Sequence, residues 1–135
     1  MGTVSTIREG EITALDTFTA LTGANGDSTN NAISVPPKVS TIRGIRVSAA
    51  QDGSTAGAGS FNMKLTGDGL DLQQIFTCGA WSNVGTETST AVTSDVTLIE
   101  CNIPVNTNGI ISVFGGVAGS ADPGTVSMSV ELVFQ

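Results

Sequence analysis

The most regular pattern in the sequence is a strict alternation of apolar and polar residues close to its C-terminal end. In the stretch TVSMSVELVF, Thr125 to Phe134, five apolar residues share one parity: Val126, Met128, Val130, Leu132 and Phe134. Successive side chains of a β-strand point to opposite faces, so this pattern predicts a strand with one face in a core. A slip of one residue would move the whole apolar set to solvent, so burial also fixes the register. We expect this strand to be interior, with a partner on each side.

Seven other segments have strand character and are separated by turn or loop signals. In chain order they are residues 17–21, 32–35, 39–50, 60–66, 70–77, 91–105 and 109–114. Gly44 lies inside the third segment and predicts a β-bulge or a bend. No window of helical length has a convincing helical stripe of apolar residues, and a helical turn is expected only at Arg8–Leu15. About eight short strands predict an all-β protein, a single antiparallel β-sandwich with jelly-roll or Greek-key connections.

The chain of 135 residues has the length of one domain. We expect the sandwich to occupy residues 16–135. Residues 1–15 alternate poorly, and we expect them to form an N-terminal arm or extended segment that becomes ordered on a neighbouring molecule. Residues 22–31, 51–59, 79–90 and 115–124 are rich in small and polar residues and are expected to be loops.

Charged residues make up only 13% of the chain, and the formal net charge is −7. A nucleic-acid-binding protein needs clustered cations, because neutralised phosphates release counterions. Arg43 and Arg46 are the cations closest together, and simple strand alternation would place them on opposite faces. These features argue against direct nucleic-acid binding and against attraction to anionic membranes. No run of 18 apolar residues predicts a membrane-spanning helix, and the N-terminal segment has no signal-peptide pattern.

Side chains for enzyme chemistry are few. The chain has no His and no Tyr, which removes the commonest general base and the Ser-His-Asp arrangement. Carboxylate pairs occur at Glu9 with Glu11 and at Asp68 with Asp71. Glycoside hydrolysis can use such pairs, but its clefts normally present aromatic platforms, and this chain has one Trp and five Phe. We expect no enzymatic activity.

Calcium is the ion for which the sequence offers oxygen ligands, and no other cofactor is expected. The candidate ligands are Asp27, Asp68 and Asp71, each in a turn-rich segment. The alternative, Asx turns in which these side chains bond their own backbone, fits the sparse acids better. Cys78 and Cys101 either pair across adjacent strands or remain free. Free thiols are favoured, because nothing else in the sequence indicates an oxidising compartment.

The predicted strands present Ser and Thr where many soluble proteins place Lys and Glu. Edge strands are usually protected by charge or proline, and only the prolines at positions 36, 37 and 104 offer this here. Ser and Ala lose little side-chain entropy on contact, so such a surface packs readily against copies of itself. The candidate contact residues are Ile7, Ile12 and Trp81. Trp81, in a predicted loop, is either an interface anchor or a plug for the open end of the sandwich.

Several features of the chain occur together: a start at Met1 without a signal, about eight strands, loops rich in Ser, Thr, Gly and Ala, few Lys and a strong terminal strand. In these features, over Thr17–Phe134, the sequence resembles small viral structural proteins, namely single jelly-roll capsid proteins and the decoration, or cement, proteins of tailed phages. No diagnostic motif carries the resemblance, so no functional residues are transferred. It implies a virion protein made in the host cytoplasm, a homo-oligomer with three copies, and contacts with other capsid proteins.

The N-terminal segment departs from one property of that group. Jelly-roll coats that package RNA often begin with a basic arm, whereas residues 1–22 contain one Arg against Glu9, Glu11 and Asp16. This favours a decoration, shell or vertex protein that contacts protein over a coat that binds the genome. The alternative function is an extracellular binding or adhesion module, stabilised by calcium. Exposed aromatic residues or a ligand-bound acidic loop would distinguish it.

Overall fold

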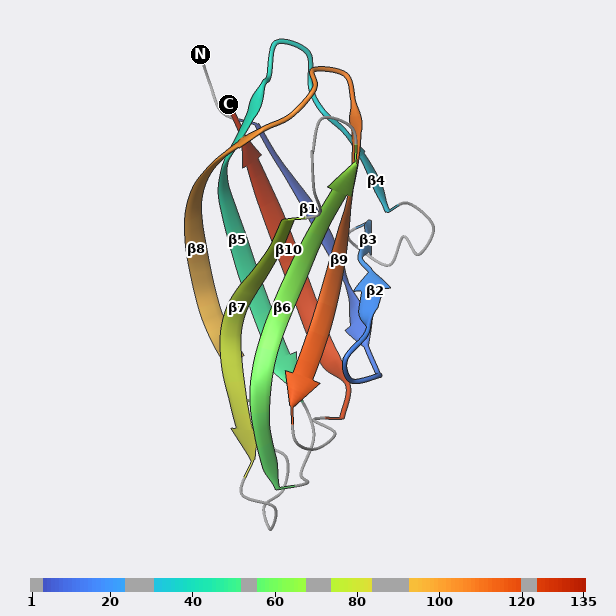
Figure 1. Ribbon diagram of the computed structural model, residues 1–135, viewed down its shortest axis with the longest axis vertical. Helices are drawn as coiled ribbons and strands as arrows, with labels where there is room; N and C mark the ends of the chain where they lie inside the picture. The colour runs from blue at the N-terminus through green and yellow to red at the C-terminus, as the bar shows by residue number, and fades with distance from the viewer. Residues whose placement is uncertain (1–3, 24–30, 52–55, 68–73, 84–92, 120–123) are drawn as a thin grey trace.

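Two antiparallel β-sheets face each other in the computed structural model, which describes residues 4–23, 31–51, 56–67, 74–83, 93–119 and 124–135 (Figure 1). The described residues contain ten strands and no helix. In chain order the strands are β1 (Val4–Ile12), β2 (Phe18–Ala20), β3 (Thr22–Gly23), β4 (Ala32–Ser34), β5 (Thr41–Gln51), β6 (Gly57–Gly67), β7 (Gln74–Asn83), β8 (Thr93–Pro104), β9 (Ile110–Gly119) and β10 (Val126–Phe134). The predicted all-β sandwich is confirmed.

The order of the strands shows how the chain is wound. Sheet A has the order β3-β1-β10-β5-β8, and sheet B has the order β2-β9-β6-β7, with β4 also paired to β9. The antiparallel pairs are nested: β1 with β10, β2 and β4 with β9, β5 with β8, and β6 with β7. One long hairpin folded over on itself gives this nesting, so the sandwich is a jelly roll. Of the two predicted topologies, the jelly roll is the one observed.

Strand β10 lies in the middle of sheet A. It has nine residue pairs to β1 on one side and nine to β5 on the other. Its five alternating apolar residues are all buried: Val126, Met128, Val130, Leu132 and Phe134. The predicted interior strand is confirmed. Because β1 and β10 come from opposite ends of the sequence, sheet A is complete only when the last strand is in place (Figure 1).

The core lies between the two sheets and is mostly aliphatic. Strand β6 contributes Phe61, Met63 and Leu65, which are fully buried in one hydrophobic cluster with the inward residues of β10. Ile12 from β1 and Trp81 from β7 join the same cluster. Full burial of a large apolar side chain stabilises the folded state by about 1.5–3 kcal/mol, so this cluster is the main source of stability.

The N-terminal segment differs from the prediction. Val4–Ile12 is a strand with nine pairs to β10, so the sandwich begins within residues 1–15 and not at Asp16. Arg8–Ile12 is likewise strand and not helix. The alternation of β1 is hidden because Arg8 occupies an inward-facing position. Its Nη2 donates a hydrogen bond of 2.7 Å to the carbonyl oxygen of Ala32 in β4, although its Nε is buried with no hydrogen-bond partner among the described residues. A polar side chain thus occupies a position where an apolar one would mark the pattern.

Two strands of sheet B run further than predicted. Strand β7 continues to Asn83 and β9 continues to Gly119, although loops are predicted from Gly79 and Gly115. The pairing of β6 with β7 shifts register so that Cys78 is an extra residue in β7. A bulge of this kind changes which parity faces the core. The second half of β7 therefore does not continue the alternation of the first half, and a pattern with a period of two residues misses it.

The bulge predicted at Gly44 is confirmed. Along β10, Val133 pairs with Gly44 and Phe134 pairs with Ile42, so Arg43 is the extra residue of β5. The pairing between β5 and β8 also shifts between Ile42 and Gly44. Strand β5 is therefore distorted towards both of its neighbours, β10 and β8, at this place.

Candidate interaction surfaces

The outer face of sheet B carries exposed apolar side chains. Phe18 in β2 is 37% exposed, and Ile75 in β7 is 58% exposed. The strand register places Ile75, Lys64 and Phe114 in one row across β7, β6 and β9. Around this row the outward positions are mostly small: Ala20, Ala58, Ser60, Ala80 and Ala118. Aromatic and aliphatic side chains with little charge are typical of the centre of a protein interface.

Lys64 is held between two aromatic rings at the centre of this face. Its Nζ lies 4.8 Å from the ring centroid of Phe18 and 4.6 Å from that of Phe114. A cation over an aromatic face is attracted by the ring quadrupole. Gly116 makes room for the arrangement, since a Cβ there would lie 3.0 Å from Cδ1 of Phe18. Three strands that are distant in the sequence thus build one fixed aromatic cluster.

The two sheets differ in charge. The five strands of sheet B contain one charged residue, Lys64. The strands of sheet A contain eight: Arg8, Glu9, Glu11, Arg43, Arg46, Asp95, Glu100 and Glu131. Among the strands that the structure describes, negative charge is confined to sheet A. A contact made through the strands of sheet B therefore brings together fewer of the described charges than a contact made through sheet A.

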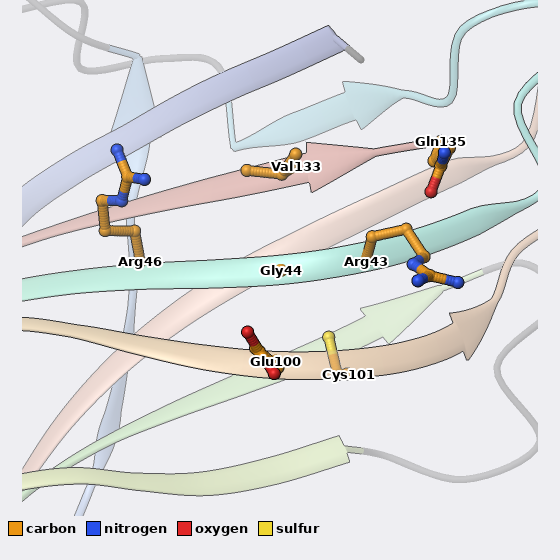
Figure 2. A pocket seen from close by; sticks show the side chains of 7 residues that line it. All are labelled: Arg43, Gly44, Arg46, Glu100, Cys101, Val133 and Gln135. Atoms are coloured by element: carbon orange, nitrogen blue, oxygen red, sulfur yellow. The ribbon is translucent and has the colours of Figure 1, made fainter. Parts of the chain in front are cut away.

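A shallow depression lies on the outer face of sheet A at the bulge in β5 (Figure 2). Its volume is about 440 Å³, and it is lined by Arg43, Gly44, Arg46, Glu100, Cys101, Val133 and Gln135. Figure 2 shows the side chains of Arg43 and Arg46 on either side of Gly44, which has no side chain to fill the space between them. The bulge thus creates the depression and places an arginine side chain at each end of it.

The expectation that Arg43 and Arg46 lie on opposite faces is wrong. Ile42 and Ile45 are fully buried, whereas both arginines are exposed on the outer face. The extra residue in β5 shifts the parity between them, which simple alternation does not take into account. Arg46 Nη1 lies 3.4 Å from Oε1 of Glu131. Within the described part of the chain, no carboxylate forms an ion pair with Arg43.

Both cysteines are free thiols, which was the favoured alternative. Burial raises the pKa of the Cys78 thiol to about 12, although a hydrogen bond with the backbone of Met63 acts in the opposite direction. Burial also raises the pKa of Cys101, and the positive charge of Arg43 partly opposes this. The thiolate is the nucleophilic form of cysteine. Neither thiol is therefore activated for chemistry at neutral pH.

The three predicted contact residues have different surroundings. Ile7 is 41% exposed and lies on the outer face of sheet A, opposite Glu131. Ile12 is fully buried. Trp81 is in β7 and not in a loop, and its Nε1–H donates a hydrogen bond of 3.1 Å to the carbonyl oxygen of Ala118. The structure thus places Ile12 and Trp81 in the core and leaves Ile7 on a surface.

The predicted calcium ligands Asp27, Asp68 and Asp71 lie outside the residues that the structure describes. Within the described ranges, no three His, Cys, Asp or Glu side chains gather into a group that would hold a metal ion. The described residues also include no helix long and apolar enough to cross a membrane.

Comparison with known proteins adds no family to this description. No protein-family model matches the chain, and no curated protein sequence matches it. The fold defines the class, a jelly-roll β-sandwich. Its function has to be inferred from its two outer faces.

Proposed function

We propose that this chain is a structural protein of a virus particle, a self-associating jelly-roll shell or decoration protein that stabilises a lattice by protein–protein contacts. The observation that carries the proposal is the outer face of sheet B, where an acidic chain presents one charge and a central aromatic cluster. The jelly roll supports it, because viral capsid proteins are among the proteins built this way. Because one fold can serve many functions, the composition of the outer face supports the proposal more strongly than the topology does.

The outer face of sheet B is large enough for a stable contact with a second copy of the chain. Strands β6, β7 and β9 have 10 or 11 residues each, and the three-residue strands β2 and β4 share the fourth position, beside β9. At a spacing of about 4.8 Å between strands and about 3.3 Å per residue, these strands cover about 600 Å². Two copies in contact would bury about 1,200 Å² in total, the lower end of the range for stable, specific interfaces. Phe18, Phe114 and Ile75 would be the central anchors. The small residues around them permit close approach.

The proposal includes a homo-oligomer of three copies, contacts with other capsid proteins, and location in the virion. A closed ring of three copies fits the three-fold positions of an icosahedral shell, and its contacts are heterologous, so the face of sheet B on each copy packs against a different surface of the next copy. Neither nucleic acid nor a membrane is a partner in it, because the cations of this chain are few and each sheet presents at most two on its outer face.

The test is the mass of the chain in solution, measured by light scattering on a sizing column over a range of concentrations. Ile75→Lys introduces a charge into the face of sheet B, and Phe18→Ser removes one ring of the cluster. We expect each to weaken self-association about tenfold or more, as for anchor residues of an interface. Val4→Lys is the matched control, because Val4 is 44% exposed but belongs to sheet A.

Repeating the measurement with a calcium chelator separates the proposal from its alternative. A closed oligomer that does not respond to the chelator supports the virion protein. A chain that is monomeric at every concentration contradicts self-association. A monomer whose melting temperature falls on chelation would favour the extracellular binding or adhesion module.

A further inference from the structure

The depression between Arg43 and Arg46 has a defined chemical preference. The chain has five cationic and twelve acidic residues, and two of the five line this one depression. We propose that it binds carboxylates on strand β1 of a second copy of the chain, namely those of Glu9 and Glu11. This inference rests on the self-association proposed above, and it supplies a second contact, on the opposite sheet.

The basic half of the contact is built by the bulge in β5. The bulge turns both guanidinium groups to the outer face and leaves Gly44 between them without a side chain (Figure 2). The Arg46 side chain is 52% exposed although it is paired with Glu131. Arg43 is exposed and is paired with no carboxylate of the described residues. A guanidinium group can bind a carboxylate through two parallel hydrogen bonds. Arg43 is therefore the group that binds the incoming carboxylate.

The charges around the depression favour a carboxylate carried by a protein over a free anion. Glu100 also lines the depression, and Glu131 is bound to Arg46, so these two acids balance the two arginines. A small free anion gains little from a site with no net charge. A carboxylate that arrives on a strand is positioned by the other contacts of that strand, and it then meets Arg43 at short range.

The acidic half of the contact lies on the same outer face, on β1. Glu9 and Glu11 pair with Ser129 and Ser127 of β10, which face outward. Successive outward residues of a strand are about 7 Å apart, and residues three apart, as Arg43 and Arg46 are, lie about 10 Å apart. Glu and Arg side chains are long enough to take up this difference.

The acidic and basic groups lie towards opposite ends of this face. Arg43 lies near the end of β10, between the partners of Val133 and Phe134, whereas Glu11 lies beside Ser127, near the start of β10. Between these ends, Ser129 of β10 pairs with Ser48 of β5, and both are too small to hold two sheets apart. Strand β10 separates β1 from β5, so two copies with these faces opposed and their strands crossing at a large angle place β1 of each copy over β5 of the other, with Glu11 towards Arg43. Such a contact is isologous, since each copy supplies both halves.

A charge swap tests this inference directly. The dissociation constant is measured by sedimentation equilibrium for the unchanged chain, Arg43→Glu, Glu11→Arg and the double variant R43E/E11R. Lys38→Glu is the matched control, because it changes the net charge as Arg43→Glu does but lies in the connection between β4 and β5. A thermal melt of each variant checks that it is folded.

We expect Arg43→Glu and Glu11→Arg each to weaken association about tenfold or more, because each places like charges opposite each other. The double variant should return to within about threefold of the unchanged chain, and Lys38→Glu should stay within about twofold of it. The inference is overturned if Arg43→Glu is no weaker than Lys38→Glu, or if the double variant is not restored. If the unchanged chain still associates in that case, only the contact on sheet A is refuted and the proposed function is not. If the unchanged chain does not associate at all, both the proposed function and the contact on sheet A are refuted.

Discussion

Leu132 is the residue whose truncation tests the central position of β10 most directly. It is fully buried on the middle strand of sheet A, and its cross-strand neighbours are Thr6 of β1 and Ile45 of β5. Leu→Ala changes in protein cores cost about 3–5 kcal/mol, and the cost is highest where the surroundings cannot collapse into the cavity. Paired strands on both sides hold the neighbours of Leu132 in place. We therefore expect Leu132→Ala to lower the free energy of unfolding by about 4 kcal/mol.

The loss would be a large part of the total, since domains are stable by about 5–15 kcal/mol. Each kcal/mol shifts the melting temperature of a domain of this size by about 3–5 °C, so we expect a fall of about 12–20 °C. Urea denaturation followed by circular dichroism gives the free energy directly. Ser127→Ala is the control, because Ser127 is exposed on the same strand, and its change should stay within about 0.5 kcal/mol.

A small effect would refute the register of β10. If Leu132→Ala costs less than about 1 kcal/mol, or no more than Ser127→Ala, Leu132 does not face the core. Because the side chains of a strand alternate, a shift by one residue would bring the polar set inward and turn all five apolar residues outward.

Three further outcomes follow from local contacts. Lys64→Gln should lower the free energy of unfolding by about 1 kcal/mol in urea denaturation, because it removes the cation held between two rings. Gly59→Ala should cost about 3 kcal/mol or more, because a Cβ at Gly59 would overlap the carbonyl oxygen of Ala118, which is backbone and cannot move aside. Ser60→Ala, at the next position, is its control and should be nearly neutral. Burial raises the pKa of Cys78 from 9.0 to about 12, so the folded state holds this proton more tightly than the unfolded chain does. Its contribution to stability is therefore complete below pH 9 and is lost as the pH rises from 9 towards about 12, and Cys78→Ala should reduce that slope in denaturation curves measured across this range.

The elements that could be predicted from the sequence are those in which burial and period agree. The stretch Val126–Phe134 has one fully buried parity on an interior strand, so its pattern was complete and its prediction was correct. Strand β1 lies towards one edge of sheet A and carries Arg8 at an inward position, where its two terminal nitrogens donate hydrogen bonds to the backbone carbonyl oxygens of Ile7 and Ala32. A polar residue in such a place cannot be distinguished from a solvent-facing one by its type.

Bulges caused the other errors. Gly44 was correctly predicted as a bulge, but its consequence, that Arg43 and Arg46 share one face, depends on where the extra residue falls. The extra residue Cys78 in β7 had a similar effect, because it moved Trp81 to an inward position that the simple alternation did not predict. The position of a bulge is set by the pairing with a neighbouring strand, and that pairing cannot be deduced from the sequence of either strand alone.

The two outer faces should respond to salt in opposite ways, and this offers a way to separate their contacts. The face of sheet B has one charge, and contact between apolar surfaces does not weaken as ionic strength rises. The proposed contact on sheet A depends on Arg43 and the acids of β1, and exposed charges are screened over about 10 Å at 0.1 M salt but over about 3 Å at 1 M. We therefore expect large assemblies at low salt to dissociate at about 1 M salt into a small oligomer of defined mass. Ile75→Lys should remove that small oligomer, whereas Arg43→Glu should leave it intact and prevent only the larger assemblies. If high salt yields monomers of the unchanged chain, or if Arg43→Glu and Ile75→Lys act on the same species, the two faces do not make independent contacts.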